Sequence, residues 1–85
     1  DDPSRDGRAV DGNGDTIVVV GNFVPNAKGG WAIKSDDGGK TWMDLTPELK
    51  KLDTQKNKVS MLYNVKIFDS GKIVFYGDTN YVYNP

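Results

Sequence analysis

The stretch SDDGGKTW, Ser35–Trp42, is the most informative part of this sequence, because it combines carboxylates, glycines, a hydroxyl and an indole in one short segment. Three kinds of loop use such residues: a metal-binding loop, a phosphate-binding loop, and a turn that holds a β-hairpin together. A helix-loop-helix calcium site needs acidic residues at alternate positions, whereas Asp36 and Asp37 are adjacent. A phosphate loop needs an additional upstream glycine, and Gly38–Thr41 matches only the end of that pattern.

The hairpin turn explains each residue type in the stretch. Ser35 ends one strand, and the Asp37 carboxylate is expected to accept hydrogen bonds from backbone N–H groups across the turn. Gly39 permits a positive φ where the chain reverses, and the Thr41 hydroxyl is expected to bond back into the turn. Trp42 is expected to cover the loop and bury its ring against the hairpin.

This stretch resembles the Asp-box, S-x-D-x-G-x-T-W, also called the bacterial neuraminidase repeat. All five specified positions match, at Ser35, Asp37, Gly39, Thr41 and Trp42. The preceding GNF…GGWAIKS segment is also similar to the strand that enters the box. In that family the box joins the third and fourth strands of a propeller blade, at the periphery, in a structural role. The resemblance therefore implies a propeller-like fold and specifies little about function.

The remaining sequence predicts an all-β fold of antiparallel sheets, because segments rich in β-branched and aromatic residues alternate with Asn, Asp and Gly turns. Strands are expected at residues 16–20, 31–34, 41–45, 61–68, 72–76 and 81–83, with a weak strand near residues 8–11. One short helix is expected at residues 46–52, where Thr46 is a candidate cap and Pro47 suits the first position.

An internal repeat links Thr16–Asn22 to Lys72–Asp78, 56 residues later, and each copy ends in glycine plus a short polar residue. Repeated units of four short strands predict propeller blades. We expect a single unit over residues 1–85, with a first blade at 8–46, a connection at 47–60 and an incomplete second blade at 61–85. The chain stops where a second turn like 35–42 would begin, so we expect a slice of a longer protein or a protomer that completes its sheet with neighbours.

Composition narrows the chemistry that the chain can perform. Histidine and cysteine are both absent, which excludes disulfides and the usual zinc ligands. The net charge of −1 gives no electrostatic reason for binding nucleic acid. No apolar run approaches the ~18–20 residues that a membrane span requires. The sequence therefore predicts no metal or other cofactor, no nucleic-acid partner and no membrane span.

Catalysis by this chain is not expected, because the usual general base and thiol nucleophile are missing. Sialidase, the best-known activity of the resembled family, uses an arginine triad, a tyrosine with a glutamate partner, and an aspartic acid. The sequence offers only Arg5, Arg8 and Glu48 toward that set. No catalytic residue is therefore assigned.

Two carboxylate pairs are candidates for glycoside hydrolysis, which needs two facing acids. They are Asp44 with Glu48, and Asp69 with Asp78. Most carboxylates of the chain stand beside glycine or asparagine in turns, where turn formation is their ordinary role. We therefore favour the structural interpretation of both pairs.

Aromatic side chains provide the candidate interaction surface. Trp31 and Trp42 are expected to be core or loop-covering residues. Tyr81 and Tyr83 lie on one face of the last strand, at an unfinished sheet edge, and are the candidate interface residues.

The function predicted from the sequence is that of a non-catalytic structural, assembly or binding module built on Asp-box blades. Its expected partners are other protein chains, through self-association or a larger assembly, with glycans as a further candidate. The expected location is extracellular, secreted or on a virion surface. The alternative is a fragment of a sialidase-like glycoside hydrolase or lectin whose site lies on missing blades.

Overall fold

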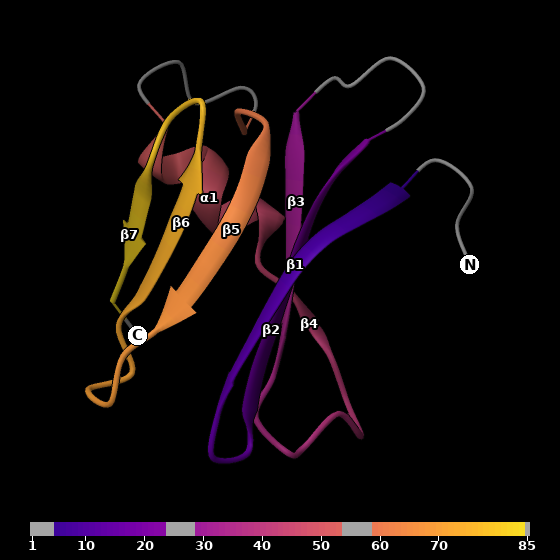
Figure 1. The fold of residues 1–85 in the computed structure, drawn as a ribbon, viewed down its shortest axis with the longest axis vertical. Helices are drawn as coiled ribbons and strands as arrows, with labels where there is room; N and C mark the ends of the chain where they lie inside the picture. The colour runs from indigo at the N-terminus through magenta and orange to yellow at the C-terminus, as the bar shows by residue number, and fades with distance from the viewer. Residues whose placement is uncertain (1–4, 24–28, 54–58, 85) are drawn as a thin grey trace.

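The computed structural model describes residues 5–23, 29–53 and 59–84, which form two antiparallel sheets and a short helix (Figure 1). The first sheet contains, in spatial order, β1 (Arg5–Asn13), β2 (Thr16–Phe23), β3 (Gly30–Ser35) and β4 (Met43–Asp44). The helix α1 (Thr46–Leu52) leads to the second sheet, which contains β5 (Leu62–Ile67), β6 (Ile73–Gly77) and β7 (Tyr81–Tyr83). The all-β antiparallel fold predicted from the sequence is confirmed.

The first strand is longer than the sequence predicts. β1 has nine residues and pairs with β2 along its length, with one irregularity between Gly7 and Ala9. Gly12 and Asn13 still belong to the strand, and the reversal falls between Asn13 and Thr16, where Gly14 adopts φ +62°. A short turn of this kind keeps both strands in register, so pairing rather than local propensity extends β1.

The core lies between the two sheets and is closed by α1. Alternate residues of β2 and β6 point into it, as the two-residue period of strands requires. Its buried members are Val18, Val20, Ala32, Leu45, Leu49, Val59, Leu62, Val65, Ile67, Ile73, Phe75 and Tyr81.

Helix α1 begins one residue after the buried Leu45 and carries Pro47 in its first turn. The predicted cap is wrong in detail, because the Thr46 hydroxyl accepts a hydrogen bond from the Ala32 N–H at 3.1 Å, outside the helix. The Asp44 carboxylate accepts the Thr46 N–H instead, at 2.9 Å. This arrangement fixes the helix against β3, and the buried Leu49 attaches it to the core.

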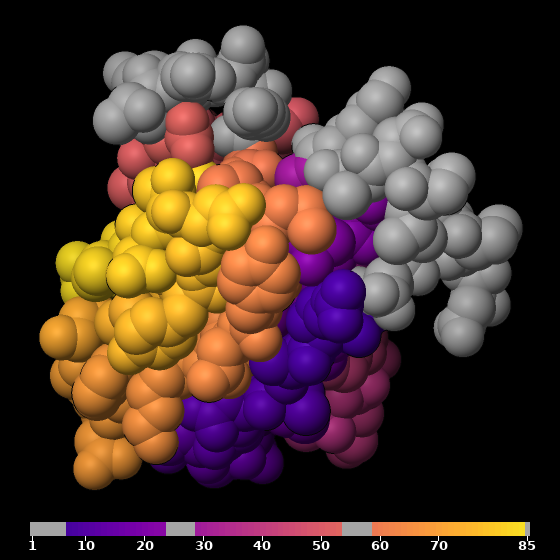
Figure 2. Space-filling model, turned by 45° about the horizontal axis from the view of Figure 1, so that its top comes forward, coloured from indigo at the N-terminus to yellow at the C-terminus, as the bar shows by residue number. Residues whose placement is uncertain are grey.

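The two sheets meet along β1, β2 and β5, and Figure 2 shows β5 in orange directly against β1 in indigo. Polar side chains join them at two places, where Asp11 accepts the Ile67 N–H at 2.7 Å and Asn22 bonds to Leu62. The backbones come close near Gly30, where a Cβ atom would lie 2.7 Å from the Ser60 carbonyl oxygen. Glycine is therefore required there by contact between chain segments.

Candidate functional site

The turn at 35–42 is organised around one carboxylate. Asp37 Oδ1 accepts the N–H groups of Lys40 at 3.0 Å and Thr41 at 2.9 Å, and the Ser35 hydroxyl at 2.7 Å. Asp37 Oδ2 accepts the Thr41 hydroxyl at 2.5 Å. The Ser35 oxygen in turn accepts the Gly39 N–H at 2.8 Å. The hydrogen bonds expected from Asp37 and Thr41 are thus present.

These hydrogen bonds also set the charge of the turn. The donors of Thr41, followed by the Ser35 hydroxyl, hold the pKa of the Asp37 carboxyl well below its ordinary value. A carboxylate that stays ionised and is occupied by four donors is a poor proton donor and a poor base. The geometry of this turn therefore supports a structural role for Asp37.

The two tryptophans differ in burial. Trp31 is buried, and its indole N–H donates to the Asn22 carbonyl at 3.2 Å. Trp42 donates to the Gly39 carbonyl at 3.1 Å, but its side chain is 44 % exposed. The indole lies over the turn beside Gly39, as expected, but the expectation that its ring is buried is wrong.

The structure corrects the choice of Tyr81 as an interface residue. Its ring lies in the core and is 2 % exposed; its hydroxyl donates to the Asp53 carboxylate and accepts the Ser60 N–H. Burial, and then the bond to Asp53, raise the pKa of Tyr81 above its ordinary value. Tyr83 is partly buried against the same core. The shared face predicted for these residues therefore turns toward the protein interior.

The candidate carboxylate pairs each make structural contacts. Asp44 binds the first turn of α1, and Glu48 pairs with Lys51 at 3.5 Å on the same helix. Asp69 accepts the Asn13 amide at 3.0 Å, and Asp78 accepts the Tyr63 hydroxyl at 3.3 Å. Asp44, Asp69 and Asp78 thus hold turns and strand ends, and Glu48 forms an ion pair within α1.

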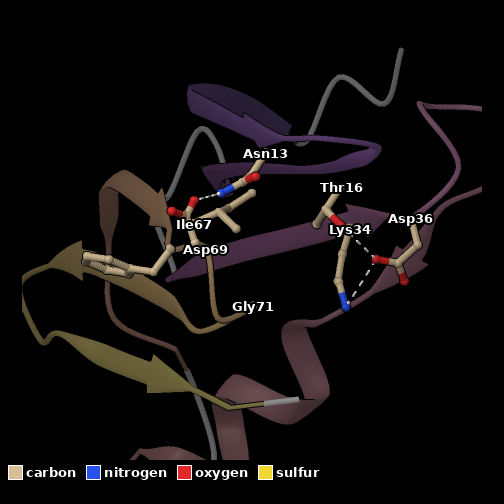
Figure 3. A pocket seen from close by; sticks show the side chains of 8 residues that line it. Asn13, Thr16, Lys34, Asp36, Ile67, Asp69 and Gly71 are labelled. Atoms are coloured by element: carbon tan, nitrogen blue, oxygen red, sulfur yellow. Dashed lines mark hydrogen bonds and ion pairs between the residues drawn. The ribbon is translucent and has the colours of Figure 1, made fainter.

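A cleft of about 230 Å³ opens between the strand ends of the two sheets (Figure 3). Its polar side chains bond to one another, because Asn13 donates to Asp69 and Asp36 receives both Thr16 at 3.3 Å and Lys34 at 3.4 Å. Ile67 and Phe68 supply apolar lining. The cleft is smaller than a usual small-molecule site, and its charged groups already have partners within the chain.

Asn22 is the structurally important residue that sequence reasoning missed. Its buried amide accepts the Leu62 N–H at 2.7 Å and donates to the Leu62 carbonyl at 3.0 Å. One side chain thereby takes the place of a neighbouring strand between the two sheets. The available signal was the Gly-Asn pair that ends the first repeat, although locally such a pair indicates a turn.

The outer faces of both sheets carry apolar side chains. Val10 on β1 is 63 % exposed, and Val82 on β7 is 48 % exposed. Tyr63 and Tyr76 are also exposed, on β5 and β6. Two sheets that share one core therefore each present a second, partly apolar surface.

No protein-family model, no curated protein and no solved structure matches this chain. Among the described residues no group of three or more metal-ligating side chains gathers. In that same part of the chain, the helical segment α1 has seven residues and is far too short to cross a membrane. Functional inference therefore depends on the surfaces and contacts described above.

Proposed function

We propose that this chain is a non-catalytic structural module that assembles with other protein chains through the outer surfaces of its two sheets. The observation that carries the proposal is the exposure of Val10 and Val82 on opposite sides of a chain whose inner faces already form a core. Apolar side chains grouped on an outer sheet face are typical of interaction surfaces.

An open sheet edge supports the same proposal. Within the described residues β7 pairs with β6 alone, at the edge of a three-stranded sheet. The corresponding strand of the first sheet, β3, has β4 as a further neighbour. An edge strand offers unpaired N–H and C=O groups to another chain, so the second sheet has both a face and an edge for partners.

The chemistry of the polar residues favours assembly over catalysis. The sequence contains no histidine or cysteine, and the four candidate carboxylates make structural contacts at strand ends, at turns and within α1. The five residues that resemble an Asp-box act together in one hydrogen-bonded turn. These contacts support the proposed Asp-box kinship as a structural one.

Sedimentation equilibrium of the full chain across a wide range of concentration tests the proposal. We expect the average mass to rise with concentration, because the exposed faces are removed from water on association. A monomeric mass at every concentration would contradict an assembly role by self-association. A glycan array with the same chain tests the carbohydrate-binding alternative, for which we expect no binding.

A further inference from the structure

We propose that a second copy of this chain stacks head to tail on the first, so that the contact between the two sheets is repeated between molecules. The outer face of the β5–β7 sheet in one copy then packs on the outer face of the β1–β4 sheet in the next. The inference rests on the proposed assembly function. It specifies the partner, the two surfaces that meet and the head-to-tail orientation of the contact.

The two sheets bury opposite faces of equivalent strands. Val18 of β2 is fully buried between the sheets, whereas Val74, its counterpart 56 residues later, lies on the outer face of β6. Conversely, Phe75 is fully buried between the sheets, and its counterpart Val19 lies on the outer face of β2. A two-fold arrangement would bury the same positions in both sheets, so the contact is head to tail.

Strand pairing extends this relation across each sheet. We call the outer row of the first sheet, formed by cross-strand neighbours, the front face: Val10, Val19 and Ile33. The matching row of the second sheet is buried in the shared core, where β5 contacts the first sheet and β7 contacts α1: Val65, Phe75 and Tyr81. The side of the second sheet that is equivalent to the front face is therefore already packed against another part of the same chain.

The same holds for the outer side of the second sheet. We call this surface the back face, and it comprises Val74, Tyr76 and Val82. Its counterparts in the first sheet lie on the side toward the second sheet, with Val18 and Val20 in the shared core and Lys34 in the cleft. Within one chain, the side of the first sheet that is equivalent to the back face therefore packs against the side of the second sheet that is equivalent to the front face.

One molecule carries both of the uncovered surfaces, the front face on its first sheet and the back face on its second. A second copy is therefore a sufficient partner, because its front face can cover the back face of the first copy. The most exposed side chains of the two faces, Val10 and Val82, would then leave water together. Such a contact continues until a ring closes or a filament grows.

The contact between copies is expected to be weaker than the contact within the chain. Asn22 and Asp11 join the two sheets by hydrogen bonds to backbone groups. Their counterparts are Asp78, which accepts the Tyr63 hydroxyl, and Lys66, which has no acceptor oxygen on its side chain. We therefore expect reversible association that depends on apolar contact.

Two single substitutions, studied by sedimentation velocity, test whether the contact between copies is head to tail. Val10→Lys blocks the front face and Val82→Lys blocks the back face, and each should weaken self-association by on the order of tenfold or more. Mixing the two variants should produce a one-to-one dimer, because each retains the face that the other lacks. Leu52→Lys, which adds the same charge at an exposed apolar position outside both faces, should associate like the wild type. Circular dichroism and melting establish that each variant is folded.

The outcomes separate this inference from the proposed function. A wild-type chain that stays monomeric would overturn this inference together with assembly by self-association. Association of the wild type, with no dimer in the mixture of blocked variants, would overturn the head-to-tail contact and leave the assembly role intact. Self-association of one blocked variant at the wild-type level would also overturn the contact, because it would indicate a two-fold interface through the other face.

Discussion

The turn at 35–42 and the junction between Asn22 and Leu62 use the same device in different surroundings. In each, a polar side chain satisfies backbone groups that no strand pairs. Asp37 does so within an exposed turn, with partners two to four residues away. Asn22 does so in the buried contact between sheets, with a partner 40 residues away. Because a buried backbone group without a partner costs more than one in contact with water, we expect burial, more than the number of hydrogen bonds, to decide how much such a side chain contributes to stability.

The strongest way to test this comparison is Asn22→Leu. The substitution leaves the Leu62 N–H and C=O unpaired away from water, so we expect a loss of about 2–4 kcal/mol in the free energy of unfolding, since each such group costs ~1–3 kcal/mol. Urea unfolding measures the loss. Asn84→Leu changes the same residue type at an exposed position and should have little effect. Equal losses of unfolding free energy in both variants would contradict a special role for the hydrogen bonds between Asn22 and Leu62.

Tyr81→Phe tests a second buried contact, with an expected loss of about 1–2 kcal/mol because the hydroxyl bonds both Asp53 and Ser60. Its raised pKa adds a pH dependence. Above about pH 10 the unfolded chain ionises while the folded phenol stays neutral, so wild-type stability falls until the pH passes the folded pKa.

The stability difference between wild type and Tyr81→Phe should therefore shrink as the pH rises above about 10. Urea midpoints at neutral and alkaline pH measure it. Tyr83→Phe, on the same strand, is the matched control and should follow the wild type at both pH values. A difference between wild type and Tyr81→Phe that stays constant with pH would contradict the assignment.

Asp37→Asn probes the exposed side of the comparison, and its loss in melting temperature should be smaller than that of Asn22→Leu because water can solvate the freed donors. The pKa of Asp37 is lowered, so its contribution is present above the unfolded pKa of about 3.9 and is lost as the pH falls toward the folded pKa. The gap between wild type and variant should close in acid. Asp36→Asn removes the same charge at the neighbouring position and serves as the control. An identical effect of both substitutions would contradict a specific role of the Asp37 carboxylate in the turn.

The smallest expected effect belongs to Trp42→Phe. It removes the hydrogen bond from the indole to the Gly39 carbonyl and keeps an aromatic ring on a half-exposed site. We expect a loss of about 0.5 kcal/mol, at the lower end for a hydrogen bond in contact with water. Thermal melting measures it. A loss as large as that of Asn22→Leu would show that the indole has a buried role.

The sequence predicts where the strands lie better than it predicts what each strand face contacts. Runs of β-branched and aromatic residues predict β2 and β6 because local propensity and burial agree there. The two-residue period of a strand also places Tyr81 and Tyr83 on one face, but it cannot tell whether that face meets the core, since both choices give the same pattern. The turn at 35–42 is predictable because its partners are local. Asn22 is not, because its partner is distant in sequence.

The hydrogen bonds between sheets have a consequence for how fast the chain folds. They join residues 40 and 56 positions apart, so a long loop must close before either contact forms. The second sheet has only three short strands and needs the first as its docking surface. We therefore expect refolding on the millisecond-to-second scale usual for non-local β topologies, with Asn22→Leu speeding unfolding if the junction forms after the rate-limiting step.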